Sequence, residues 1–351
     1  MEVSDLWIYA LITMVCFFAS CGQKWSETDQ GEYILVEQRN GPPIGYSAES
    51  GASLLEIDGF IFKDLNGNGE LDPYEDWRLP VDERAADLAS KMSIEQIAGL
   101  MLYSSHQAIP STSGGFGGPA TYDGTQYPQS GADPWDLTDQ QKQFVINDNL
   151  RHVLITSVES PETAARWNNN IQQLAEGLGL GIPVNTSSDP RHGSDSYAEY
   201  NAGAGGEISL WPGTLGIAAT FNPDIMKRFG EIASIEYRAL GIATALSPQI
   251  DLASEPRWSR FDGTMGEDPQ LAADMARAYV DGFQQSDSEH EIESGWGFQS
   301  VNAMVKHWPG GGAQEGGRDA HYAYGSYAVF PGGNLEDHLI PFVEGAFDLE
   351  G

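Results

Sequence analysis

Apolar residues follow two alternating patterns from about residue 79 onward. In one pattern they recur at helical spacing, and in the other they form short continuous runs. The first pattern predicts helices at residues 79–92, 93–101, 138–150, 160–179, 222–241, 268–283 and 334–351. The second predicts strands at residues 99–105, 152–158, 182–189, 243–251 and 301–308, with a long Gly- and Ser-rich loop at 104–135. Ser93, Ser160 and Asn222 stand where three of these helices should begin.

The alternation of strands and helices predicts the fold class. Repeated strand–loop–helix units with apolar strands are typical of an α/β protein, in which helices cover a parallel sheet. A doubly wound sheet and a (β/α)8 barrel both fit this order. No Gly-rich phosphate loop follows the first strand, and the later strands end in polar stretches such as "SSDPRHG" and "KHWPGG". Because barrel enzymes carry their functional groups at such strand ends, these features favour a TIM-type barrel.

The charge balance excludes one class of partner. The 351 residues include 18 Lys and Arg against 51 Asp and Glu, which gives a net charge of −33. Such a surface repels phosphate backbones and anionic lipid, so we expect no nucleic-acid partner. A hydrophobic content of 40% still provides material for a large core.

The N-terminus predicts export. Residues 6–20 form an apolar run that is too short for a comfortable membrane span but suits a signal peptide. The following "FASC" resembles a bacterial lipoprotein cleavage box before Cys21, although Phe18 replaces the commoner Leu and no Lys or Arg precedes the run. We expect a lipoprotein-type signal peptide at 1–21, a lipid anchor on Cys21 as the only membrane contact, and a polar tether at 22–50. The exported lipoprotein would be periplasmic or anchored to the outer membrane, with no cysteine left for catalysis.

A metal-binding motif, "DLNGNGELDPYEDW", precedes the predicted strands. Its oxygen-bearing residues match positions 1, 3, 5, 7, 9 and 12 of an EF-hand loop: Asp64, Asn66, Asn68, Glu70, Asp72 and Glu75. Gly69 stands at position 6, where the loop turns sharply. A solvated acidic turn is the alternative. Because a calcium sensor usually has paired loops, we expect a structural Ca²⁺ ion that braces a leader at 51–78.

Polar residues at the ends of three predicted strands are the candidate chemistry. Asp189 in "NTSSDPRHG" can accept hydrogen bonds from a sugar diol, or it can cap a turn. Arg257 and Arg260 in "SEPRWSRFDGTMGEDP" are scarce cations, and one of them can instead pair with a nearby carboxylate. Lys306 and His307 end the fifth strand as a pair of donors, or as part of a buried ion pair. Together these strand ends point to one carbohydrate-binding site.

At these residues the chain resembles the N-terminal barrel domain of glycoside hydrolase family 3, the β-glucosidase and exo-β-glucanase family. The resemblance runs from about residue 79 to 351, and some bacterial members have an EF-hand-like leader. It implies that four residues bind the non-reducing glucosyl unit, namely Asp189, Arg260, Lys306 and His307. It also implies that Arg318, in "QEGGRD", lies close to the nucleophile.

The resemblance implies two further carboxylates. Retaining glycosidases use a nucleophile and an acid/base that are about 5–5.5 Å apart. In the family the nucleophilic aspartate sits near the end of the seventh strand, and the acid/base usually comes from a following α/β-sandwich domain. The chain contains neither, so we expect 79–351 to be a partial barrel of about five to six βα units that is inactive alone. The parent protein would hydrolyse O-glycosyl bonds and release β-linked glucosyl units from the non-reducing ends of β-glucosides or β-glucans.

Two other functions stay open. In one branch of the family, the β-N-acetylglucosaminidases, an Asp–x–His pair supplies the acid/base, and "GRDAHYAYG" offers Asp319 and His321 at similar spacing. The loop lacks the histidine of that branch's "PGHG" motif, which favours the glucosidase. The second possibility is a lipid-anchored protein that binds glycans without cutting them.

Overall fold

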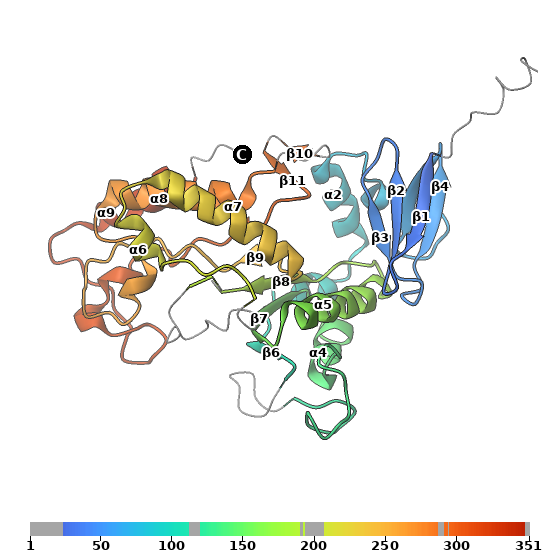
Figure 1. Cartoon of the computed structure of the whole chain (residues 1–351), viewed down its shortest axis with the longest axis horizontal. Helices are drawn as coiled ribbons and strands as arrows, with labels where there is room; N and C mark the ends of the chain where they lie inside the picture. Colours follow the sequence, from blue (N-terminus) through green and yellow to red (C-terminus); the bar gives the residue numbers. More distant parts are fainter. Residues whose placement is uncertain are drawn as a thin grey trace, which may run out of the picture.

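The computed structural model describes residues 24–111, 120–189, 192–193, 207–286, 291–293 and 295–347. The expected signal peptide, including Cys21, lies outside these residues. Figure 1 shows a group of antiparallel strands beside helix α2 (Val81–Lys91) at one end, and a larger α/β part beyond it. Within the described ranges, no helix is long and apolar enough to cross a membrane.

The N-terminal leader contains an antiparallel sheet where a polar tether was expected at 22–50. Its strands are β1 (Trp25–Asp29), β2 (Ile34–Gln38) and β3 (Ile44–Tyr46), paired in that order. The segment is polar in composition, but side chains of a strand alternate between two faces, so a few apolar residues suffice to build one buried face. Val36, Ile44 and Ile61 form the buried centre of this second, smaller core.

A hairpin follows, formed by β4 (Ser53–Ile57) and β5 (Phe60–Asp64). Its two turn residues, Asp58 and Gly59, have φ of 57° and 81°, as the favoured hairpin turn requires. Trp77 packs against this hairpin. Its ring stacks on Phe62 with the ring centroids 5.3 Å apart, and its Nε1 donates to the Ile61 carbonyl at 3.0 Å.

The larger part is built on a five-stranded parallel sheet, which confirms the predicted α/β class. Its strands are β6 (Gln107–Ile109), β7 (His152–Val158), β8 (Asn185–Ser188), β9 (Thr244–Ala245) and β12 (Asn302–Ala303). They lie in the order β12-β9-β8-β7-β6, so the sheet follows the chain without a reversal. A short hairpin of β10 (Glu291–Glu293) and β11 (Trp296–Gly297) is inserted before β12.

The first parallel strand was predicted at 99–105, and the structure places it later. The apolar run there begins inside helix α3 (Ile94–Leu100) and continues into the exposed Met101. Only Tyr103 pairs with the sheet, through a bridge to His152, before β6 begins at Gln107. A short apolar run does not distinguish a helix end from a strand, which explains the displacement.

The helices predicted from the sequence are present. Besides α2, they are α3, α4 (Asp139–Ile146), α5 (Pro161–Glu176), α7 (Pro223–Ala239), α8 (Pro269–Gln284) and α9 (Leu335–Ile340), which the π-helical turn η6 (Pro341–Ala346) extends. The short helix α6 (Thr214–Ala218) was not predicted. Short 3₁₀ turns are η1 (Pro73–Glu75), η3 (Phe261–Gly263), η4 (Gly311–Ala313) and η5 (Glu315–Gly317). The side chains of Ser93, Ser160 and Asn222 accept hydrogen bonds from backbone N–H groups of the helices that follow them.

The main core fills the space between the sheet and helices α5, α7 and α8. Trp167 of α5 and Ile155 of β7 are fully buried. Helices α7 and α8 contact each other through aromatic rings, with Phe229 packing against both Tyr279 and Phe283. Burial on this scale fixes the strands, and with them the residues at the strand ends.

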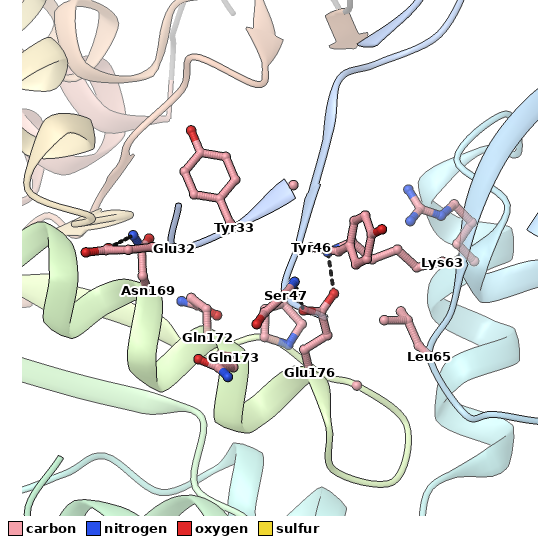
Figure 2. A pocket seen from close by; sticks show the side chains of 14 residues that line it. Glu32, Tyr33, Tyr46, Ser47, Lys63, Leu65, Asn169, Gln172, Gln173 and Glu176 are labelled. Atoms are coloured by element: carbon pink, nitrogen blue, oxygen red, sulfur yellow. Dashed lines mark hydrogen bonds and ion pairs between the residues drawn. The ribbon is translucent and has the colours of Figure 1, made fainter. Parts of the chain in front are cut away.

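Helix α5 also connects the leader to the α/β part. Glu176 at its end pairs with Lys63 of β5 at 2.7 Å, and Asn169 donates to Glu32 of the leader at 3.0 Å. A cavity of about 470 Å³ lies between these contacts. Figure 2 shows the polar side chains of α5 on one side of it, facing Tyr46 across the gap. Because its ionic and amide groups already bind one another, we interpret this cavity as the interface of the leader.

Candidate functional site

The carboxyl ends of β8, β9 and β12 meet in one region. Asp189 follows β8 directly. Beyond β9 and β12, the backbones of Gln249 and Lys306 pair in parallel. The two segments that follow these strands therefore continue side by side past the regular sheet. The N–H of Ile250 donates to the Lys306 carbonyl at 2.7 Å. This pairing fixes the backbone from which Lys306 and His307 project.

Lys306 and Asp189 form an ion pair in this region. The Lys306 ammonium lies 2.8 Å from Oδ1 of Asp189, and their side chains are 16% and 12% exposed. Behind the pair, the hydroxyl of Tyr237 donates to the Asp189 carbonyl at 2.8 Å. The buried ion pair that the sequence left open as an alternative for Lys306 is therefore present. The partner of Lys306 is Asp189, which was itself predicted to bind the sugar.

Arg260 and His307 form a second contact. Nη1 of Arg260 lies 3.4 Å from Nε2 of His307. Nδ1 of the same imidazole lies 2.9 Å from Oδ2 of Asp251, and Trp258 meets the ring edge-on with centroids 6.3 Å apart. The side chain of Gln249 donates to the Arg260 carbonyl at 2.9 Å and holds that residue in place.

Trp258, Arg260 and His307 line a cavity of about 290 Å³. Its lining includes Arg260, His307, Trp308, Asp319 and His321. Asp189 and Lys306 belong to the adjoining ion pair and do not line this cavity. A cavity of this size is suited to a monosaccharide-sized ligand, with aromatic and hydrogen-bonding groups on its walls.

Asp319 is the carboxylate among the described residues that line the cavity. Its Oδ2 accepts from the indole Nε1 of Trp258 at 2.7 Å, and its Oδ1 accepts from the His321 N–H at 2.9 Å and contacts the His321 ring. Burial raises the pKa of Asp319, but the hydrogen bonds from His321 and Trp258 outweigh it and lower the pKa to about 2. Asp319 is therefore an ionised acceptor at neutral pH, and it contacts the ring of His321, whose side chain is exposed.

The remaining predicted arginines lie at the surface. Arg318 is exposed, is 3.4 Å from Glu315, and does not line the cavity. Arg257 forms a bidentate pair with Glu255, the closer contact being 2.6 Å. Asp268 caps α8, accepting from the Leu271 N–H at 2.8 Å.

Sequence reasoning missed Asp251 and the role of Trp258. Asp251 ends the stretch "ATALSPQID", and a carboxylate at the end of an apolar strand is the same signal that singled out Asp189. Trp258 was noted only as lying between two arginines. Its hydrogen bond to Asp319 joins residues 61 positions apart, and no local pattern predicts such a contact.

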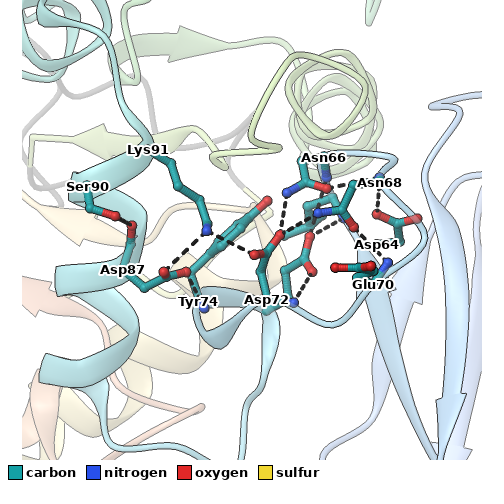
Figure 3. A network of polar contacts seen from close by, with 11 residues as sticks. Asp64, Asn66, Asn68, Glu70, Asp72, Tyr74, Asp87, Ser90 and Lys91 are labelled. Carbon is teal, nitrogen blue, oxygen red and sulfur yellow. Dashed lines mark hydrogen bonds and ion pairs between the residues drawn. The ribbon is translucent and has the colours of Figure 1, made fainter.

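The EF-hand-like loop forms its own polar network (Figure 3). Asp64 and Glu75, both buried, accept hydrogen bonds from loop N–H groups, including Gly69 at 3.0 Å and Leu65 at 2.7 Å. The amide groups of Asn66 and Asn68 both donate to Oδ2 of Asp72, at 2.6 and 2.8 Å. The side chain of Glu70 is exposed, as expected where the backbone carbonyl is the ligand.

Lys91 of α2 completes this network. Its ammonium lies 2.9 Å from Oδ1 of Asp72, and this hydrogen bond is the main reason why the pKa of Asp72 is lowered. Among the described residues, no three His, Cys, Asp or Glu side chains gather closely enough to hold a metal ion. The oxygen atoms of the loop nevertheless suit a hard cation as ligands, once the side-chain amides of Asn66 and Asn68 turn their oxygens inward.

The fold and site together define a class of protein: a parallel α/β domain with a polar, aromatic cavity at the carboxyl ends of its strands. Residues 124–345, more than half of the chain, match the model of the glycosyl hydrolase family 3 N terminal domain. The chain belongs to glycoside hydrolase family 3.

Relatives of known name agree with this assignment. The chain is 44% identical over 300 residues to a periplasmic beta-glucosidase/beta-xylosidase of Dickeya chrysanthemi, which covers 85% of the chain and 42% of the relative. It is 37% identical over 273 residues to a probable beta-glucosidase C of Aspergillus oryzae, covering 77% of the chain and 38% of the relative. The chain thus spans less than half the length of these relatives.

Solved structures show the same similarity. A β-glucosidase from Erythrobacter marinus matches with a TM-score of 0.52 and 25% identity, covering 71% of the chain and 28% of that structure. A β-glucosidase involved in saponin metabolism, from intestinal bacteria, matches with a TM-score of 0.52 and 26% identity, over 76% of the chain and 28% of that structure.

Proposed function

We propose that this chain forms the glycone-binding part of a glycoside hydrolase that releases β-linked glucosyl units from the non-reducing ends of β-glucosides or β-glucans. The contact between Arg260 and His307, in the wall of a monosaccharide-sized cavity, is the observation that supports it most directly. The Lys306–Asp189 pair beside the cavity supplies further hydrogen-bonding groups. The names of the relatives in Dickeya and Aspergillus support a β-glucoside as substrate.

The proposed fold of this part is an incomplete (β/α)8 barrel with five to six βα units counted from the sequence pattern. The sheet order supports a barrel over a doubly wound sheet. Successive strands are neighbours throughout β6, β7, β8, β9 and β12, whereas a doubly wound sheet reverses its order at a switch point.

The proposed reaction is retaining hydrolysis, in which one carboxylate attacks the sugar and a second group protonates the leaving oxygen. Arg260, His307, Lys306 and Asp189 would hold the glucosyl hydroxyls in this reaction. Arg318 would act near the nucleophile only if its side chain left Glu315 and turned toward the cavity. The nucleophile itself is left unassigned.

Glucose binding tests the proposal on the 351-residue chain. In an NMR titration, D-glucose should shift resonances of the cavity wall, and Arg260→Ala should weaken the affinity at least ~10-fold, because one hydrogen bond to a charged group contributes about 1.5–3 kcal/mol. Arg257→Ala is the matched control, since that arginine pairs with Glu255 outside the cavity. Glucose binding that is absent, or equal in Arg260→Ala and wild type, would contradict the proposal.

A β-N-acetylglucosaminidase is the second candidate, favoured by the contact between Asp319 and His321 in the cavity wall. In this mechanism Asp319 would stay ionised and orient the His321 ring, which would transfer the proton. In the active enzyme that contains this chain, His321→Ala should abolish turnover if the pair is the acid/base and should have a modest effect if it is not. Comparing 4-nitrophenyl β-D-glucoside with the matching N-acetylglucosaminide identifies the substrate.

A non-catalytic glycan-binding protein is the remaining alternative. In this case the protein that contains this chain should bind glucan. It should release no 4-nitrophenol from the β-D-glucoside or from the N-acetylglucosaminide. Measurable turnover would exclude it.

We also propose that the EF-hand-like loop binds Ca²⁺ as a structural ion. The side chains of Asp64, Asn66, Asn68, Asp72 and Glu75, with the Glu70 carbonyl, would hold it. A bound cation would replace the ammonium of Lys91 as the charge that faces Asp72, and it would join the end of β5, which holds Asp64, to η1, which holds Glu75.

Thermal unfolding tests the calcium proposal. Calcium should raise the Tm of the wild type relative to EDTA, and Asp64→Ala should remove most of that increase while leaving glucose affinity unchanged. Lys91→Ala should tighten calcium binding, because it removes the competing cation from Asp72. Glu56→Ala, an exposed carboxylate on the neighbouring hairpin, is the control. Equal Tm values in calcium and EDTA would contradict the proposal that the loop binds a structural Ca²⁺ ion.

Export is part of the same proposal. The Dickeya relative is named as periplasmic, which supports an exported protein. Anchoring through lipid on Cys21 remains a prediction from the sequence. Metabolic labelling with a fatty acid should mark the wild type and not Cys21→Ser.

A further inference from the structure

We propose that Asp251 is a positioning residue that fixes the ring orientation and tautomer of His307, so that the ring presents a hydrogen-bond acceptor to the cavity. The ligand in this inference rests on the proposed function, whereas the tautomer rests on the geometry of Asp251 and His307 alone. From the sequence, Asp251 has no predicted role, and His307 is expected to act as a donor.

Asp251 contacts His307 twice with one oxygen. Its Oδ2 lies 3.0 Å from the His307 backbone N–H and 2.9 Å from ring Nδ1. The Asp251 side chain is fully buried, at 0% exposure. A carboxylate can only accept hydrogen bonds, so Nδ1 must carry a proton.

The other ring nitrogen independently leads to the same tautomer. Arg260 Nη1 lies 3.4 Å from Nε2, and a guanidinium can only donate. In a neutral imidazole with a protonated Nδ1, Nε2 has a free lone pair and is the acceptor that Arg260 requires. Both neighbours of the ring are therefore satisfied by one tautomer and by no other neutral form.

The packing around Asp251 leaves its carboxylate little room to turn. A Cβ on Gly311 would lie 2.2 Å from Oδ1, so only glycine permits the close approach of η4. Oδ1 is buried without a hydrogen-bond partner among the described residues. A buried oxygen without a hydrogen bond is unfavourable for stability, which is expected where the orientation of a carboxylate serves function.

The groups that face Asp251 come from three elements. His307 belongs to the chain beyond β12, Arg260 reaches the same imidazole from the turn before η3, and His338 lies on α9. Burial lowers the pKa of His338 and the charge of Asp251 raises it, so His338 is also close enough to respond to this carboxylate. A substitution of Asp251 should therefore affect both His307 and His338, and the NMR signals of both rings should be followed.

This arrangement assigns complementary roles in sugar recognition. A sugar hydroxyl that enters between Arg260 and the ring can donate to Nε2 of His307, in place of the Arg260 N–H, and accept from Arg260 at the same time. Such a pair recognises a group that is both donor and acceptor, which describes a sugar hydroxyl. A carboxylate or a carbonyl oxygen offers no proton to Nε2 and would bind less well.

The tautomer is measured directly by ¹⁵N NMR of the 351-residue chain labelled at histidine, at a pH where the ring is neutral. The His307 signals, assigned by their loss in His307→Gln, should show a protonated Nδ1 and an unprotonated Nε2. Asp251→Asn should change this preference, because an amide can donate as well as accept. Asp262→Asn, an exposed carboxylate on η3, should leave it unchanged. A wild-type ring protonated at Nε2 would overturn the inference even if Asp251→Asn did not fold.

Titration with D-glucose gives the second readout. Asp251→Asn should weaken glucose binding ~10-fold, by analogy with the loss of a carboxylate that orients a metal-binding histidine. Unchanged affinity in Asp251→Asn would overturn the role in binding. If the wild type bound no glucose, the proposed function would fail, while the NMR result would still decide whether Asp251 sets the tautomer.

Discussion

The ion pair between Lys306 and Asp189 joins two strand ends that are 117 residues apart in sequence. Because both side chains are mostly buried, neither charge can recover full hydration when the other is removed. The pair therefore serves two purposes: it fixes the relative positions of the ends of β8 and β12, and it holds a carboxylate and an ammonium beside the cavity.

Lys306→Met should reduce the free energy of unfolding by roughly 3 kcal/mol, since it leaves the Asp189 carboxylate buried without a cation. Urea unfolding measures the change. Arg228→Met is the matched control, because Arg228 pairs with Glu231 on the surface with 66% and 43% exposure, and the loss should be below about 1 kcal/mol. Equal losses for the two variants would show that the pair near the cavity is effectively solvated.

Asp319 should give the protein an acid-sensitive component of stability. The pKa of Asp319 is lowered from 3.8 to about 2 in the folded state, so its carboxylate stabilises the fold above the unfolded-state value. That contribution should be lost as the pH falls from about 4 to about 2. The urea midpoint of the wild type should therefore fall more steeply in this window than that of Asp319→Asn.

Asp274→Asn is the control for this measurement, because its side chain is 55% exposed beside Arg277. Its midpoint curve should stay parallel to that of the wild type. Parallel curves for Asp319→Asn as well would show that the hydrogen bonds from Trp258 and His321 do not hold the carboxylate in its ionised form.

At the scale of elements, the leader is a small unit on whose core Trp77 packs together with Trp25, Tyr46 and Leu54. Trp77 stacks on Phe62 and binds the Ile61 carbonyl, and its ring also fills the space against Gly41, where a Cβ would lie 2.7 Å from it. These contacts join β5 to the segment before β3, so the stability of the leader should depend strongly on Trp77.

Trp77→Ala should destabilise the leader by about 3–5 kcal/mol, the usual cost of removing a large aromatic side chain from a core. Hydrogen exchange should accelerate in β2 and β5 and stay unchanged in β7 and β8. Trp308→Ala, which removes a 66% exposed ring, is the control and should leave exchange in the leader unaltered. Faster exchange throughout the α/β part would indicate one cooperative unit instead.

Sequence patterns predicted the elements well where both a period and a cap were present. Helices α5 and α7 begin beside the expected Ser160 and Asn222, and the parallel sheet was predicted from the apolar strands. The first strand was misplaced because its apolar run straddles the end of α3. The leader strands were overlooked because the segment at 22–50 is mostly polar, and its large apolar residues are confined to Trp25, the run at 33–36, Ile44 and Tyr46.

The site could be predicted only in part, for a related reason. A polar residue that ends an apolar strand is visible in the sequence, and it identified His307 and Arg260, which the structure brings into contact. The partner of such a residue depends on how separate strand ends meet in space. Asp251 behind His307 and Trp258 behind Asp319 could therefore be found only in the structure.

At the scale of the whole molecule, the large excess of acidic residues destabilises the folded state. A net charge of −33 produces mutual repulsion that opposes the compact state. Added salt screens this repulsion over a length of about 10 Å at 0.1 M. The Tm should therefore rise as NaCl is increased from about 0.02 to about 0.3 M.

This salt dependence is measured by thermal unfolding in EDTA, so that ion binding by the loop at 64–75 does not contribute. KCl should act like NaCl, since screening depends on ionic strength rather than on the identity of a monovalent ion. A Tm that falls with salt would mean that attractive pairs such as Lys306–Asp189 outweigh the net repulsion.

Helix α5 has a consequence for how the chain is made. Glu32 and Lys63 leave the ribosome more than a hundred residues before Asn169 and Glu176, the groups that hold them. A nascent chain paused before residue 161 would therefore carry its leader strands undocked, open to proteases and to pairing with other chains. Protection should appear in a single step, when the last turn of α5 emerges.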